Sequence, residues 1–100
     1  MTPNEYVKLA VATEMNKPDA IGDRSQNLSR LLHAAMGLCT ESGEFMDALK
    51  KSIIYGKDFD GVNAAEELGD QMWYVAIACD ALGVSLESIM EKNIAKLKVR

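Results

Sequence analysis

The amino-acid sequence predicts a single all-α domain of four helices over residues 1–100. Apolar residues recur at intervals of three and four along most of the chain, and no stretch alternates apolar and polar residues as a β-strand would. Hydrophobic residues make up 48% of the chain but aromatic residues only 6%, which favours an adaptable helical core over a β-sandwich. Because so small a domain buries only roughly two thirds of its unfolded surface, we expect the four-helix bundle to be completed by oligomerisation.

The first helix is predicted over about residues 3–15. Thr2 is a suitable N-cap, Pro3 suits the first helical position, and Glu5 completes a capping box. The segment 16–25 that follows is rich in turn-forming residues and poor in apolar ones. We expect it to be an exposed connection, which serves either as a lid over a site or as a plain linker.

A long second helix is predicted from Asn27 to Gly56, because apolar residues keep their helical spacing throughout this stretch. Its strongest apolar stripe is centred near Ala35 and Ile53. Another face carries three small residues, which are Ala34, Gly37 and Ala48. Small side chains let a second helix or a ligand come close, so this helix is expected to pack on two sides.

A third helix is predicted over about residues 63–82, with Asn63 and Glu66 as its capping box. Its second half holds one charged residue and is otherwise apolar on all sides, which predicts a mostly buried helix. Gly83 is suited to end it, and Ser85 is suited to cap a fourth helix that finishes in a strongly basic segment.

Composition excludes several classes of function. The formal net charge of -4 and the pI near 4.9 argue against a basic nucleic-acid-binding surface. No apolar run approaches the ~20 residues that a membrane span needs, and the N-terminus lacks the features of a signal peptide. Cys39 and Cys79 stand in apolar helical patterns without a metal-binding spacing, so we expect two reduced core thiols in a cytoplasmic protein.

Four acidic residues form two pairs with the same spacing. Glu41 and Glu44 stand three apart on the second helix, and Glu67 and Asp70 stand three apart on the third. Residues three apart share a helix face, so each pair can direct two carboxylates at one point. Carboxylate oxygens converging from two helices are the ligands that Mg²⁺ or Mn²⁺ selects. The sequence therefore predicts a divalent-cation site, to which Asp47 and Glu66 could add outer groups.

These motifs also carry a resemblance to a known family. The runs 32–44 and 66–74, with the closing run 93–100, resemble the MazG-like all-α nucleoside triphosphate pyrophosphohydrolases. The family signature is ExxE on one helix and ExxD on the next, and both are present. Family members often have Ala where Ser42 stands, and many continue beyond Arg100.

The resemblance implies Mg²⁺-dependent hydrolysis of a nucleoside triphosphate to the monophosphate and pyrophosphate by a metal-activated water. Glu41, Glu44, Glu67 and Asp70 would then be the metal ligands and catalytic groups, with either Glu41 or Glu44 as the base that orients the water. It further implies a homodimer or homotetramer with its sites near the subunit contact. Six further residues are candidates for contacts with the substrate: Lys96, Asn93, Lys50, Lys51, Arg100 and His33.

Two other classes of protein remain open. A non-catalytic helical interaction module would carry the same acids as solvated surface groups, without activity and without a response to Mg²⁺. A di-iron carboxylate bundle usually needs ExxH pairs, and His33 is the one histidine of the chain. The sequence does not select the base or sugar of a nucleotide substrate. Trp73 and Tyr74 could stack on a base, although a core or subunit contact suits a buried helix better.

Overall fold

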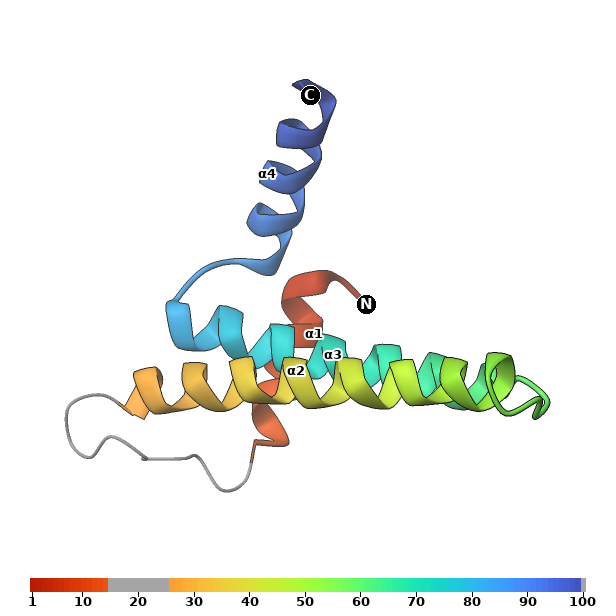
Figure 1. The fold of residues 1–100 in the computed structure, drawn as a ribbon. Coiled ribbons are helices and arrows are strands. Elements are labelled where there is room, and N and C mark those ends of the chain that lie inside the picture. Colours follow the sequence, from red (N-terminus) through yellow and green to blue (C-terminus); the bar gives the residue numbers. More distant parts are fainter. Residues whose placement is uncertain (15–25, 100) are drawn as a thin grey trace.

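The protein, described here by a computed structural model for residues 1–14 and 26–99, folds into four α-helices (Figure 1). They are α1 (Pro3–Ala12), α2 (Gln26–Ile53), α3 (Gly61–Leu82) and α4 (Leu86–Val99). The described residues contain no β-strand. The prediction of an all-α, four-helix fold is confirmed, whereas the predicted lid or linker over 16–25 lies outside the described residues.

The two long helices α2 and α3 form the body of the molecule. They lie side by side and run in opposite directions, joined by a short connection, and α1 packs across α3 (Figure 1). The last helix, α4, projects away from this body and touches mainly α1. The radius of gyration is 16.0 Å, compared with about 13 Å for a compact domain of 100 residues. One chain therefore does not close a compact bundle on its own.

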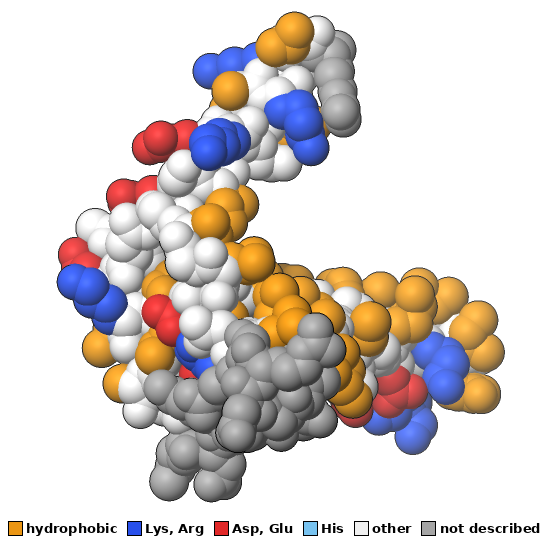
Figure 2. Space-filling view, turned by 90° about the vertical axis from the view of Figure 1, so that its left-hand side faces the viewer, with side chains coloured by type: hydrophobic (Ala, Val, Ile, Leu, Met, Phe, Trp, Pro, Cys, Tyr) orange, Lys and Arg blue, Asp and Glu red, His pale blue; other side chains and the backbone are white. Residues whose placement is uncertain are grey.

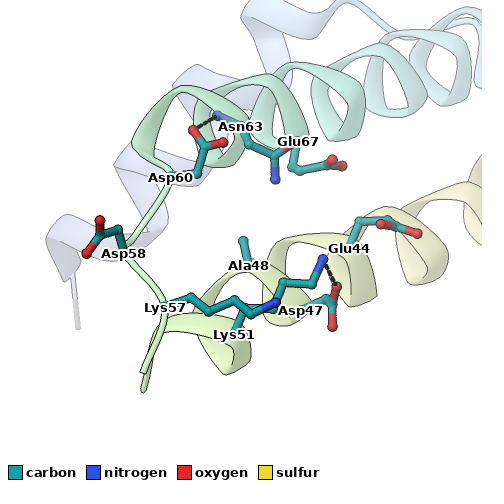
Figure 3. Close-up of a pocket in the computed structure, with 9 residues that line it drawn as sticks. All are labelled: Glu44, Asp47, Ala48, Lys51, Lys57, Asp58, Asp60, Asn63 and Glu67. Atoms are coloured by element: carbon teal, nitrogen blue, oxygen red, sulfur yellow. Dashed lines mark hydrogen bonds and ion pairs between the residues drawn. The ribbon is translucent and has the colours of Figure 1, made fainter. Parts of the chain in front are cut away.

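The helix ends follow the expected capping chemistry, except at the end of α1 and at the start of α3. The first helix ends at Ala12, with Thr13 as its C-cap, and not near residue 15. The Thr2 hydroxyl accepts the Glu5 N–H, and Gly83 ends α3 with a φ of 71°, as expected from the sequence. The predicted N-cap of α3 was wrong: Asp60, not Asn63, holds that position, and its carboxylate accepts the Asn63 N–H at 3.0 Å (Figure 3). An Asp in extended backbone three residues earlier starts the helix sooner, so Asn63 lies inside the first turn.

Small residues bring α2 and α3 close together, as the sequence predicts. Ala34 and Gly37 on α2 are buried, as are Ala76 and Ile77 on α3. The ring of Tyr74 lies over Gly37 so closely that a Cβ atom there would stand 2.2 Å from a ring carbon. Glycine at this position therefore sets the separation of the two helices beside the acidic pairs.

The two cysteines have different surroundings. Both thiols are free, but only Cys79 is buried, and burial raises the pKa of its thiol. Cys39 is exposed, so the expectation of a second core thiol was wrong. The reason is that Cys39 lies on the side of α2 that the body of this chain leaves uncovered.

A buried ion cluster connects three segments at the end of the helix pair opposite to the α2–α3 connection. Arg30 of α2 is 4% exposed, and its guanidinium donates to Glu14, which follows α1, and to Asp80 of α3. The hydrogen bonds to Glu14 are the main reason why the pKa of Arg30 is raised. Glu14 is equally buried, at 7% exposure, so each charge offsets the cost of burying the other.

Large apolar side chains are exposed on both the helix pair and α4. The expectation that α2 packs on two sides is not met within this chain, because Ala35 and Ile53, at the centre of its strongest apolar stripe, are exposed, Ile53 at 74%. Of the residues in α4 only Leu86 is buried, while Ile89, Met90, Ile94 and Leu97 are each 40–52% exposed. Figure 2 shows apolar side chains continuing from α4 over the body beside it. Within the described part of the chain, no single helix is long and apolar enough to span a membrane, and only α3 and α4 taken together, across a bend of 103°, pass that test.

Candidate metal centre

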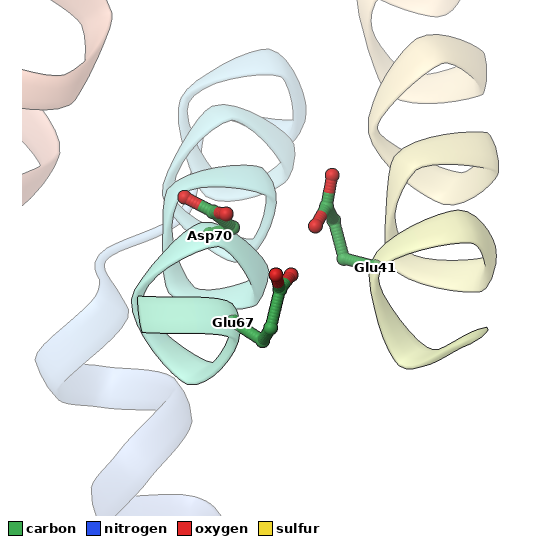
Figure 4. A group of neighbouring side chains, drawn as sticks. All are labelled: Glu41, Glu67 and Asp70. Atoms are coloured by element: carbon green, nitrogen blue, oxygen red, sulfur yellow. The ribbon is translucent and has the colours of Figure 1, made fainter. Parts of the chain in front are cut away.

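Three of the four paired carboxylates meet between α2 and α3. Glu41 from α2 and Glu67 and Asp70 from α3 each place one oxygen within 4.8 Å of the others (Figure 4). The i, i+3 spacing puts Glu67 and Asp70 on one face of α3, and the close packing at Gly37 brings that face to Glu41. This group of Glu41, Glu67 and Asp70 is called the carboxylate triad below.

The surroundings of Glu67 in the carboxylate triad disfavour its charged form. One of its oxygens, Oε2, is shielded from solvent and has no hydrogen-bond partner. Desolvation raises the pKa of Glu67, the contact with the Glu41 carboxylate raises it further, and the charges of Asp70 and Glu44 act in the same direction. A shielded carboxylate among other carboxylates is unfavourable unless it gains a proton or a cation.

The geometry of the carboxylate triad suits a hard divalent cation. An octahedral Mg²⁺ with bonds of about 2.1 Å places neighbouring ligand oxygens about 3 Å apart and opposite ones about 4 Å apart. The oxygens of the triad already stand within 4.8 Å, so small side-chain rotations would bring them to that spacing. Three carboxylates without histidine or cysteine match Mg²⁺ or Mn²⁺ rather than a softer metal.

Glu44, the fourth predicted ligand, lies beside the carboxylate triad and is not part of it. It lines an adjoining cavity of about 320 Å³ at the end of the helix pair where α2 connects to α3 (Figure 3). Glu67 borders both the triad and this cavity, which we call the hairpin cavity. Glu44 could therefore reach a cation or its water from the cavity side.

A polar link fixes the two helices next to the carboxylate triad. The Ser42 hydroxyl donates to the Gln71 side-chain oxygen at 3.2 Å, one residue beyond Glu41 and Asp70 respectively. Ser42 stands where family members often have Ala, and the sequence pattern does not predict its contact with Gln71. Spacing along a helix could not reveal the link, because it depends on how α2 and α3 face each other.

Among the described residues, the basic side chains near the centre come from the end of α2 and the connection after it. Asp47 pairs with Lys50 at 3.5 Å and with Lys51 at 3.0 Å, and the contact with Lys51 lowers the pKa of Asp47. Lys51 and Lys57 both line the hairpin cavity. Lys57 was missed by the sequence reasoning, since only the turn at Gly56, with a φ of 68°, carries it back towards α2. Glu66 is exposed and outside the triad.

The other candidate substrate contacts are more widely distributed. Asn93 and Lys96 lie on α4, which projects from the body, so within one chain they do not border the triad or the hairpin cavity. Arg100 lies outside the described residues. His33 is on α2, two turns before Glu41. Its ring packs edge to face with the ring of Tyr74, with the two ring centroids 5.7 Å apart. The ring of Tyr74 also packs edge to face with the ring of Trp73, with their centroids 5.1 Å apart.

The fold and the carboxylate triad together define a helical protein with a candidate site for a hard divalent cation between two antiparallel helices. The family model described as the MazG nucleotide pyrophosphohydrolase domain matches residues 30–100, and the chain belongs to that family. A relative, the Gene 37 protein of Mycobacterium phage L5, is 37% identical over 81 residues, which cover 74% of this chain and 68% of the relative. No solved structure gave a significant match.

Proposed function

We propose that the protein is a Mg²⁺-dependent nucleoside triphosphate pyrophosphohydrolase, with Mn²⁺ as a possible substitute for Mg²⁺. It would add water to an NTP or dNTP and release the nucleoside monophosphate and pyrophosphate, as a housekeeping reaction on the nucleotide pool. Membership of the MazG family supports the class of reaction. The single observation that carries the proposal is the carboxylate triad with its shielded, unpartnered Glu67 oxygen.

In this proposal Glu41, Glu67 and Asp70 hold the cation. When bound there, Mg²⁺ supplies charge neutralisation at the phosphates and lowers the pKa of a water. Glu41 or Glu44 orients that water and accepts its proton; Glu44 is placed for this role because it stands at the edge of the triad and borders the hairpin cavity. No covalent nucleophile is needed, and Ser42 is engaged with Gln71.

The direct test is a screen of the common NTPs and dNTPs with Mg²⁺ for release of pyrophosphate. Glu41→Gln and Asp70→Asn each remove one negative ligand at nearly constant shape, so each should abolish turnover while circular dichroism shows unchanged helix content. Glu66→Gln is the matched control, because Glu66 is exposed on α3 next to Glu67 but outside the triad. Full turnover in both Glu41→Gln and Asp70→Asn would remove the site assignment.

We also propose that the active form is a homodimer or homotetramer. The chain exposes 7125 Å² of surface, compared with about 5600 Å² for a compact monomer of this mass. Part of the exposed apolar surface lies on α4, whose own chain covers little of it, and part lies on the outer side of α2. Association would bury this surface and could bring Asn93 and Lys96 to the site of a neighbouring copy, which one chain alone does not do.

Light scattering after size-exclusion chromatography tests the assembly. Ile94→Asp places a charge in the exposed apolar stripe of α4 and should shift the protein towards the monomer. Lys92→Asp, on the opposite face of the same helix, is the control and should leave the assembly unchanged. A wild-type protein that stays monomeric at micromolar concentration would overturn this part of the proposal.

The two free thiols and the expected substrate support a cytoplasmic location, where thiols remain reduced.

A further inference from the structure

The hairpin cavity differs in chemistry from the rest of the surface around the carboxylate triad. Its volume of about 320 Å³ is at the small end of the range for ligand pockets, so it suits phosphate groups better than a whole nucleotide. Two lysines, Lys51 and Lys57, extend into it from its α2 side and from the connection (Figure 3). The cavity shares Glu67 with the triad, so a group bound in the cavity would lie next to the triad.

Of the two lysines that line this cavity, Lys57 is not held by an ion pair with a described residue. Lys51 is paired with Asp47 at 3.0 Å, whereas among the described residues Lys57 forms no ion pair. Asp60, on the opposite wall, is occupied as the N-cap of α3. The other acidic residues that line the cavity disfavour binding of a free anion; they are Glu44, Asp47, Asp58 and Glu67. An anion would therefore enter only together with a divalent cation on the triad.

On the opposite side of the triad, α2 and α3 present rings and no lysine side chain. His33, Gly37 and Glu41 are spaced four apart and share one face of α2. Tyr74 covers Gly37 and meets the ring of His33 at 5.7 Å, and His33 itself is exposed. Between His33 and Glu41 α2 has no Lys or Arg, and α3 has none along its whole length.

The lysines on one side of the triad and the rings on the other suggest how a substrate is oriented in the site. We propose that a nucleoside triphosphate lies along the helix pair with its terminal phosphates in the hairpin cavity against Lys57, and its nucleoside pointing towards His33 and Tyr74. Pyrophosphate then departs at the hairpin end and the monophosphate at the His33 end. This orientation rests on the proposed function. Two features support it. The lysines of the hairpin cavity, with a divalent cation on the triad, offer positive charge to a polyphosphate. The rings of His33 and Tyr74 offer faces and edges to a base.

Product inhibition tests the orientation on the full-length protein with its best substrate and Mg²⁺. The probes are inorganic pyrophosphate and the nucleoside monophosphate of that substrate. Lys57→Ala should raise the inhibition constant for pyrophosphate about tenfold, the loss expected for one charge-assisted hydrogen bond, and leave that for the monophosphate within about twofold. His33→Ala should show the opposite pattern. Lys8→Ala, which removes an exposed lysine of α1, is the control for net charge and should change neither constant.

The outcomes separate this inference from the proposed function. A wild-type protein without turnover on any nucleotide overturns the proposed function. If turnover persists, and Lys57→Ala raises the inhibition constant for the monophosphate but not that for pyrophosphate, the substrate lies in the opposite orientation. Equal effects on both products, or no effect on either, remove the directional site and leave the hydrolase intact. Circular dichroism of each variant shows whether a loss reflects misfolding.

Discussion

The contact face of the α2–α3 pair and the apolar stripe of α4 carry the same kind of sequence signal and are buried to different extents. Both contain apolar residues at helical spacing. In the α2–α3 pair the chain supplies its own partner, so Ala34, Gly37 and Ile77 are buried and the acids are brought together. Along α4 the chain supplies almost no partner, and its apolar stripe stays exposed, as does the stripe of α2 centred near Ala35 and Ile53. An amphipathic pattern thus predicts a buried face without indicating which molecule covers it.

The largest effect that distinguishes the two regions should come from Arg30. Arg30→Met leaves Glu14 buried without a counter-charge at the end of the α2–α3 pair, and we expect a loss of about 3–5 kcal/mol in the free energy of unfolding. Lys92→Met on the exposed face of α4 should change it by less than about 0.5 kcal/mol. Urea denaturation measures both. Equal losses would show that the Arg30 cluster does not anchor the helix pair.

Two glycines of α2 provide a sharper comparison within one helix. Gly37→Ala forces its methyl group into the Tyr74 ring, which must move, so it should destabilise by about 1–3 kcal/mol. Gly43→Ala meets nothing within 4 Å and should stabilise by about 0.5–1 kcal/mol through helix propensity. Because Gly37 sets the separation at the carboxylate triad, Gly37→Ala should also lower turnover. A stabilising Gly37→Ala would contradict the role of that close approach.

A smaller effect should appear in the pH dependence of stability. The pKa of Glu67 is raised in the folded chain, so the folded chain holds this proton more tightly than the unfolded chain. The resulting stabilisation is complete below the pKa of an unfolded Glu and is lost as pH rises through the folded-state pKa. Glu67→Gln should flatten this acid-range decline in metal-free protein. Thermal melts from pH 4 to pH 7 in a chelating buffer measure it, and an unchanged slope would contradict the repulsion within the triad.

The sequence predicts the local features of this molecule well and the long-range ones less well. Helix positions follow from periodicity and from caps such as Thr2 and Gly83, because both depend on neighbouring residues. Lys57 and the Ser42–Gln71 link could not be predicted, because they depend on the turn after α2 and on the rotation of two helices about their axes. The projection of α4 could not be predicted either, because its apolar stripe would fit a partner in the same chain or in another.

Thermal unfolding with and without Mg²⁺ shows whether Glu41, Glu67 and Asp70 together bind one divalent cation. At a Mg²⁺ concentration ten times the Kd, binding should stabilise the wild type by about 1.4 kcal/mol. For a domain of this size that corresponds to a rise in midpoint of roughly 6–11 °C. Asp70→Asn should lose most of this rise and Glu66→Gln should keep it. A wild-type midpoint that does not respond to millimolar Mg²⁺ or Mn²⁺ would show that the carboxylate triad is not a divalent-cation site.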